Sequence, residues 1–272
     1  MEGAQIEKIG MIAGNGIYPV TFARAARAAG VKALVVSAFK GETQQSLADE
    51  VDVMEWLRVG QLSKMIRFFQ KQGVEQAVMV GQIAPKNLFD LRPDLRTVKL
   101  LARLKEKNAE SIFGGIADEL AKEGIELLPA TTFLDDLLPA PGAVCGPALS
   151  KAGLQDAEFG FRIAKEMSRL DVGQTVVVKN GTVLAVEAFE GTNEAIKRGG
   201  KMGKGKATMV KVSKPNQDLR FDVPVVGAIT IETAAEAGIT TVVVEAGRTL
   251  LLGKEELFAL CEEKKVTLVA VD

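Results

Sequence analysis

The stretch Lys8-Ile-Gly-Met-Ile-Ala-Gly-Asn-Gly-Ile-Tyr-Pro19 begins with a short apolar run and turns at Gly14-Asn15-Gly16. A helical pattern follows over residues 17–29, and residues 31–37 form a second run of β-type residues. A strand, a glycine loop, a helix and a strand in this order predict a βαβ unit and therefore a parallel sheet. We expect the first half of the chain to be a Rossmann-like α/β domain.

The alternation continues and predicts a two-domain α/β protein. Prolines, glycines and acids gather in residues 134–146, which indicates a linker. Asn180-Gly181 between two β-type runs predicts a hairpin in the second half. We therefore expect an N-terminal domain over residues 1–133, a linker over 134–150 and a C-terminal mixed α/β domain over 151–272. The Gly/Lys-rich tract 198–206 is expected to be a mobile basic loop.

Composition excludes several classes of protein. Of the 272 residues, 47% are hydrophobic and 25% are charged, which is typical of a globular protein. A net charge of -1 and 5% aromatic residues argue against a nucleic-acid partner. The two cysteines lie far apart in the sequence and fit a reducing cytosol. The sequence has neither a signal-peptide pattern nor an apolar run long enough to span a membrane, so we expect a cytoplasmic protein.

Charged residues of both signs crowd the stretch 211–230, Lys-Val-Ser-Lys-Pro-Asn-Gln-Asp-Leu-Arg-Phe-Asp-Val-Pro-Val-Val-Gly-Ala-Ile-Thr. The chain has no histidine, so hydrolytic chemistry would need carboxylates, lysines and a metal ion. Asp218 and Asp222, with Arg220 between them, are candidate ligands for Mg²⁺ or Mn²⁺ because carboxylate and phosphate oxygens bind hard cations. The alternative is a solvated ion network of these three side chains.

The glycine loop has two interpretations. Gly14-Asn15-Gly16 follows a strand and opens a helix, where backbone N–H groups can hold a phosphate. A dinucleotide site is disfavoured, because Pro19 stands at the third glycine position and Ser37 replaces the ribose-binding acid. The alternative interpretation is a tight turn that requires glycine.

The chain resembles the cytosolic, two-domain UDP-2,3-diacylglucosamine pyrophosphatases of lipid A biosynthesis, the LpxI type, over nearly its whole length. The resemblance is carried by residues 9–19, Leu91-Arg92-Pro93-Asp94, Leu170-Asp171-Val172-Gly173-Gln174, Glu190-Gly191-Thr192 and residues 214–227. Two departures are Phe113-Gly114-Gly115, where the family pattern has Gly-Asp-Asp, and Pro85-Lys86, where Arg-Pro is more usual.

The resemblance implies a metal-dependent hydrolase that produces UMP and 2,3-diacylglucosamine 1-phosphate. It assigns UDP to the first domain and catalysis and lipid binding to the second. The implied catalytic residues are Lys214, Gln217, Asp218, Arg220 and Asp222, with Asp218 and Asp222 as metal ligands. Implied substrate contacts are Gly14, Asn15, Gly16, Gly81, Glu190, Thr192, Lys211 and Thr230. Expected partners are a nucleotide-linked lipid, the cytosolic face of the inner membrane in transient contact, and a second copy in a homodimer. A non-catalytic nucleotide-sugar or lipid binding protein on the same fold is the alternative.

Overall fold

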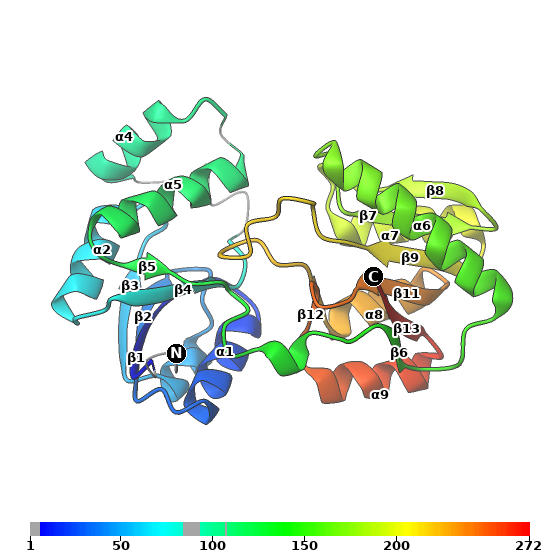
Figure 1. Cartoon of the computed structure of the whole chain (residues 1–272), viewed down its shortest axis with the longest axis horizontal. Helices are drawn as coiled ribbons and strands as arrows, with labels where there is room; N and C mark the ends of the chain where they lie inside the picture. The colour runs from blue at the N-terminus through cyan, green and yellow to red at the C-terminus, as the bar shows by residue number, and fades with distance from the viewer. Residues whose placement is uncertain (1–5, 84–92, 107) are drawn as a thin grey trace. The chain divides into compact units, whose positions relative to one another are not determined.

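A computed structural model describes residues 6–83, 93–106 and 108–272, which form two compact units (Figure 1). The first unit takes the chain up to Leu134 and also the segment Asp218–Asp222. The second unit takes residues 135–217 and 223–272. Pro85-Lys86 and Leu91-Arg92 of the sequence motifs lie outside the described residues.

The first unit is built on a parallel sheet of five strands in the order β3-β2-β1-β4-β5. The strands are β1 (Lys8–Ala13), β2 (Ala33–Phe39), β3 (Val53–Leu57), β4 (Gln76–Val80) and β5 (Glu126–Leu127). The helices are α1 (Tyr18–Ala28), α2 (Leu62–Lys71), α4 (Leu95–Arg103) and α5 (Ala109–Lys122). Side chains of α2, α4 and α5 form one apolar core with residues of the sheet, including Ile12 and Val35. Burial of such surface is the main favourable term in folding.

The second unit has a mixed six-stranded sheet in the order β6-β13-β11-β9-β7-β8. Its strands are β6 (Gly142–Cys145), β7 (Thr175–Lys179), β8 (Thr182–Val186), β9 (Ala207–Lys211), β11 (Ile239–Glu245) and β13 (Thr267–Val271). The unit also has a separate, short parallel pair of strands, β10 (Val225–Val226) and β12 (Leu250–Leu251). The helices are α6 (Lys151–Arg169), α7 (Thr192–Gly203), α8 (Ala228–Glu236) and α9 (Lys254–Lys264). Strands β9, β11 and β13 are parallel to one another, whereas β6, β7 and β8 pair antiparallel.

The predicted fold class is confirmed: a parallel Rossmann-like sheet in the first half and a mixed sheet with helices in the second. The segment expected as a linker contains β6, which pairs with β13. The prediction of a basic loop over 198–206 is wrong, because α7 continues to Gly203. A Cβ at Gly199 would lie 2.5 Å from the Val177 side chain, and one at Gly200 would lie 2.2 Å from a carbonyl oxygen. These glycines therefore let the helix pack closely and do not loosen the chain.

Candidate active site

Two glycine loops meet at the carboxyl ends of β1 and β4, where the strand order of the first sheet reverses. Open α/β sheets bind ligands at such a switch point. The N–H of Asn15 donates to the Gln82 carbonyl over 2.7 Å, and the N–H of Gln82 donates back over 3.1 Å. A Cβ on Gly14 would lie 2.5 Å from the Gln82 oxygen, and one on Gly81 would lie 2.8 Å from the Asn15 oxygen. The two loops therefore approach so closely that only glycine fits at 14 and 81.

The backbone donors of the first loop are already used within the protein. The N–H of Gly14 donates to the Val80 carbonyl over 2.8 Å, and the N–H of Gly16 donates to Oδ1 of Asn15 over 2.7 Å. With the Asn15 bond, all three N–H groups of the glycine loop have protein acceptors. The geometry therefore favours the tight-turn interpretation, since a phosphate held by these groups would have to displace existing hydrogen bonds.

Gly14→Ala should destabilise the fold more than Gly16→Ala does. The added methyl at 14 collides with backbone, and overpacking of this kind costs about 1–3 kcal/mol. At Gly16 no heavy atom lies within 4 Å of an added Cβ, so only the strain of a φ of +93° remains. Urea unfolding of both variants measures the difference. Equal losses of unfolding free energy in the two variants would contradict the explanation that Gly14 is required by the close approach of the two loops.

The glycine loops form part of the wall of an apolar cavity of about 810 Å³ that lies within the first unit. The wall includes Gly14, Asn15, Gly81 and Gln82, together with apolar side chains from α2, α4 and α5. The volume falls in the range of small-molecule sites, roughly 300–1,000 Å³. Its lining suits the hydrocarbon part of a ligand.

Phe221 also lines this cavity, although it comes from the acidic stretch near the other end of the sequence. Its ring lies 5.8 Å from that of Phe113 on α5, in a tilted arrangement. The backbone N–H of Ala130 donates to the Leu219 carbonyl over 2.8 Å. These contacts attach the segment Asp218–Asp222 to the first unit.

Asp218 and Asp222 lie at the two ends of one tight turn. The N–H of Asp222 donates to the Asp218 carbonyl over 3.0 Å. The Asp218 carboxylate accepts from Nε and Nη2 of Arg220 over 2.9 and 2.6 Å. The hydrogen bonds from Arg220 hold the pKa of Asp218 below its usual range, so this carboxylate is ionised and paired at neutral pH. Asp222 is half-buried.

The remaining charged residues of the stretch belong to the second unit. Lys211 ends β9, is 9% exposed, and donates to the Val225 carbonyl. Lys214 forms an ion pair with Asp171, and its N–H donates to Oε1 of Gln217 over 2.7 Å. The chain passes from the second unit to the first between Gln217 and Asp218. The charged stretch 211–230 is therefore divided between the units. Lys211 and Lys214 belong to the second unit, and Asp218 and Asp222 belong to the first.

The other predicted substrate contacts also lie in the second unit. The hydroxyl of Thr192, the first residue of α7, donates to Oε1 of Glu187 over 2.8 Å. Glu190 is paired with Arg198, and this hydrogen bond lowers the pKa of the carboxyl. Thr230 is half-buried in the first turn of α8.

Sequence reasoning missed a group of buried polar atoms at one end of the second sheet. Thr175 is opposite Lys211 in the pairing of β7 with β9, and the N–H of Glu187 donates to the Thr175 carbonyl. Among the described residues, four buried side-chain atoms here have no hydrogen-bond partner: Gln174 Oε1, Thr175 Oγ1, Glu187 Oε2 and Gln217 Nε2. Buried polar atoms are rarely left unpaired, so this sheet end needs water or a polar ligand. Gln217 was predicted as a catalytic residue, and Gln174 ends one of the quoted motifs, but the burial of the group was not foreseen.

An ion pair between Lys165 and Glu245 holds the start of the charged stretch 211–230 in place. Nζ of Lys165 on α6 lies 3.0 Å from Glu245 Oε1 and also donates to the Ser213 carbonyl over 3.0 Å. Glu245 Oε2 accepts from both the N–H and the hydroxyl of Ser213 over 2.7 Å. Burial alone would raise the pKa of Glu245, but the bonds from Ser213 and Lys165 hold it below its usual value. All three polar groups of Ser213 are thus held.

Glu245→Gln should cost roughly 2–4 kcal/mol of unfolding free energy, because it leaves the Lys165 charge without its partner. Arg248→Ala, which removes a cation 3.7 Å from the same carboxylate, should cost under about 1 kcal/mol. Since the pKa of Glu245 is lowered on folding, its contribution is present above its ordinary value of 4.5 and is lost as the pH falls through the folded-state pKa. Thermal unfolding between pH 7 and pH 3 tests this. An equal effect of Glu245→Gln at both ends would contradict it.

The first unit has an apolar cavity beside an acidic segment, and the second unit has a polar sheet end that carries lysines. The fold is that of a two-unit α/β protein. The sequence matches the LpxI N-terminal domain over residues 8–137 and the LpxI C-terminal domain over residues 140–269. The chain belongs to the LpxI family. It is 30% identical, over 98% of both chains, to the UDP-2,3-diacylglucosamine pyrophosphatase LpxI of Caulobacter vibrioides.

Similarity to solved structures is remote. The biotin carboxylase domain of the Hydrogenobacter thermophilus 2-oxoglutarate carboxylase aligns with a TM-score of 0.29 and 16% identity, covering 66% of this chain and 36% of that one. The biotin carboxylase subunit of a pyruvate carboxylase aligns with a TM-score of 0.28 and 14% identity, covering 67% and 35%. Among the described residues, no helix combines the length and apolarity that a membrane span requires.

Proposed function

We propose that this protein hydrolyses the pyrophosphate bond of UDP-2,3-diacylglucosamine to give UMP and 2,3-diacylglucosamine 1-phosphate in lipid A biosynthesis. The Caulobacter relative carries this substrate in its name and is similar over the whole chain. One structural observation carries the proposal: Phe221, which lies between Asp218 and Asp222 in the sequence, is part of the wall of an apolar cavity. An acyl chain in this cavity would lie beside the acids.

We assign the roles as follows. Asp222 is the proposed base for the attacking water, because the chain has no histidine and this carboxylate directly follows Phe221 of the cavity wall. Arg220, with Asp218 orienting its guanidinium, would stabilise charge on the phosphates. Within the second unit, Lys211, Lys214 and Gln217 are proposed substrate contacts, together with the unpaired polar atoms of Gln174 and Glu187. Gly14, Asn15 and Gly81 would contact its acyl part through the cavity wall. This proposal places an acyl chain in the first unit, to which the resemblance assigns UDP.

We also propose that Mg²⁺ or Mn²⁺ takes part, held by Asp222, Asp218 and the pyrophosphate oxygens. Among the described residues, no three side chains of the metal-binding types converge on one point. The protein oxygens therefore fit an ion that is shared with the substrate, the usual arrangement for Mg²⁺. Such an ion would neutralise phosphate charge.

The direct test is release of UMP from UDP-2,3-diacylglucosamine by the purified protein, measured by chromatography. Turnover that depends on Asp222 supports the proposal. Tight binding of the intact substrate without turnover by the wild-type protein, with and without Mg²⁺, would instead identify a nucleotide-lipid binding protein.

Filling the cavity should weaken binding of the acylated substrate. Ile112→Trp adds bulk at the wall, and each methylene kept out of the cavity costs about 0.8 kcal/mol, so we expect KM to rise roughly 10-fold or more. Ile163→Trp on α6, a half-buried isoleucine outside the cavity, is the matched control. Steady-state kinetics with long-chain and short-chain substrates separates the effects. An unchanged KM in a folded Ile112→Trp protein would mean that the acyl chains bind elsewhere.

A further inference from the structure

The two cysteines, which are far apart in the sequence, meet in the second unit. Cys145 is the last residue of β6, where it lies opposite Leu268 of β13, and Cys261 lies near the end of α9. Cys261 is completely buried in one apolar core of this unit, and the partly exposed Cys145 packs against the same core. Their thiols are free and are joined by a hydrogen bond. The fold therefore places side by side the two sulfurs that a disulfide bond needs.

Neighbouring contacts hold the end of β6 against the end of α9. The N–H of Gly146 donates to Oε1 of Glu262 over 3.2 Å, so the residues that directly follow the two cysteines are in contact. A Cβ at Gly146 would lie 2.2 Å from the Val266 carbonyl oxygen, which means that only glycine allows this close approach. The N–H of Val266 donates to the Cys261 carbonyl over 2.9 Å. The approach of the thiols is thus fixed by backbone contacts on both sides.

The two thiols differ in the way that thiol–disulfide exchange requires. The hydrogen bond with Cys261 lowers the pKa of the Cys145 thiol, against the opposing effects of burial and of the Glu262 charge. The same hydrogen bond, together with burial, raises the pKa of the Cys261 thiol well above its usual range. The attacking form of cysteine is the thiolate, and Cys145 is also the more accessible of the two. Cys145 is therefore the sulfur that reacts first, and Cys261 is the one that completes the bond.

We propose that Cys145 and Cys261 form a reversible disulfide bond by exchange with a low-molecular-weight disulfide, such as oxidised glutathione. The Cys145 thiol loses its proton, and its sulfur attacks one sulfur of the small disulfide. The S–S bond of the small disulfide breaks, and the first small thiol leaves with the electron pair and takes up a proton. The Cys261 thiol then loses its proton and attacks the Cys145 sulfur, which releases the second small thiol. The two protein thiols are oxidised by two electrons, and the small disulfide is reduced to two thiols.

The cysteine pair lies at the opposite end of the second sheet from the polar sheet end. Leu268, the partner of Cys145, is the second residue of β13 and pairs with Val242 near the start of β11. Lys211 and Glu245 are the last residues of β9 and β11, at the carboxyl ends of the same parallel strands. The inference is therefore independent of the proposed function, and its test does not use turnover.

The experiment incubates the full chain, without oxygen, in mixtures of oxidised and reduced glutathione. The remaining thiols are alkylated after denaturation, and the intact mass is measured. We expect the oxidised wild type to be two hydrogens lighter, with no alkyl group and no glutathione, and excess dithiothreitol to reverse this. Cys261→Ser should stop at one glutathione on Cys145, whereas Cys145→Ser should take up none, because its remaining thiol is buried.

The wild-type mass decides the inference without depending on the folding of any variant. Two thiols that stay reduced, a glutathione adduct that is not resolved, or disulfide-linked dimers on a non-reducing gel would each overturn it. Oxidation that excess dithiothreitol does not reverse would overturn it as well.

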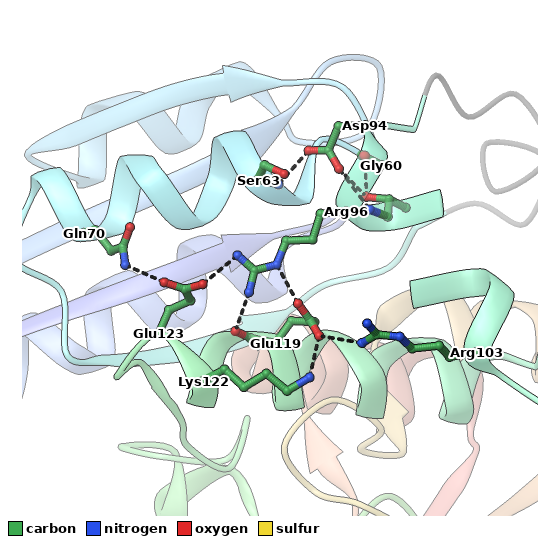
Figure 2. A network of polar contacts seen from close by, with 10 residues as sticks. Gly60, Ser63, Gln70, Asp94, Arg96, Arg103, Glu119, Lys122 and Glu123 are labelled. Atoms are coloured by element: carbon green, nitrogen blue, oxygen red, sulfur yellow. Dashed lines mark hydrogen bonds and ion pairs between the residues drawn. The ribbon is translucent and has the colours of Figure 1, made fainter. Parts of the chain in front are cut away.

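Hydrogen exchange then tests whether the bond joins the folded elements, with the first unit as an internal control, because both cysteines belong to the second. In the first unit, Arg96 of α4 binds Glu119 and Glu123, on and just beyond α5, over 2.5 and 2.8 Å (Figure 2). Exchange in α4 and α5 should be the same in the reduced and oxidised protein.

In β6 and α9, exchange should slow at least ~10-fold on oxidation, because the bond closes a loop of roughly 100 residues and restricts the unfolded chain. Equal exchange of β6 and α9 in the two forms would show that the bond forms in an unfolded second unit and not between the folded elements, which would overturn the inference.

Discussion

Asp222→Ala is expected to lower kcat by ~100-fold or more while the protein still binds its substrate, since loss of a general base typically costs 10²–10⁴-fold. The carboxylate lies at the end of the turn that begins at Asp218, one residue after Phe221 in the cavity wall. With no histidine in the chain, a carboxylate must accept the proton. The apolar and polar binding groups are unchanged by the substitution.

Asp222→Asn and Asp218→Asn provide the comparison. Asp222→Asn keeps the shape and removes only the base, so its kcat should be as low as that of the alanine variant. In the Asp218→Asn variant, Arg220 loses its charged partner, so we expect a fall in kcat together with a rise in KM. Single-turnover kinetics and calorimetric binding of the substrate measure both. Near wild-type turnover in Asp218→Ala and Asp222→Ala would leave the acidic segment as a surface ion network.

The strand–loop–helix order of the first half was predictable because it is local. Apolar runs of strand length, separated by a glycine-terminated helix, specify βαβ whatever the rest of the chain does. Strand β3 was missed although four of its five residues, Val53–Leu57, are apolar; it is a mostly half-buried edge strand interrupted by Glu55. Strand β6 was hidden in a proline-rich stretch and is defined by its pairing with β13.

The division of the charged stretch 211–230 between the two units could not be predicted from the sequence. Gln217 and Asp218 are neighbours in the chain, yet they belong to different compact units. The cause is long-range: the Leu219 carbonyl accepts from Ala130, and Phe221 packs on Phe113. The same holds for the unpaired atoms of Thr175 and Glu187, since only the tertiary structure shows that they are buried. The glycines of α7 were also interpreted wrongly. Gly199 and Gly200 were taken to indicate a mobile loop, whereas close packing of the helix requires them.

Removing divalent cations is the second change expected to have a large effect: EDTA should abolish turnover, and Mg²⁺ or Mn²⁺ should restore it. The reaction brings a nucleophile to a pyrophosphate, and Arg220 is partly neutralised by Asp218. A divalent cation would add positive charge beside the pyrophosphate. We propose that this cation is shared between the acidic segment and the pyrophosphate, the usual arrangement for Mg²⁺.

This shared arrangement makes a prediction that does not depend on activity. The protein alone should bind Mn²⁺ weakly, and a non-hydrolysable UDP analogue with a methylene bridge between its phosphates should increase the affinity, because its oxygens complete the coordination. Electron paramagnetic resonance of Mn²⁺ titrated with protein, with and without the analogue, measures this. Asp222→Asn should remove the increase, whereas Glu245→Gln, in the second unit, should keep it. Full turnover in excess EDTA would rule out the metal. Tight Mn²⁺ binding by the protein without nucleotide would show a resident ion and contradict a shared one.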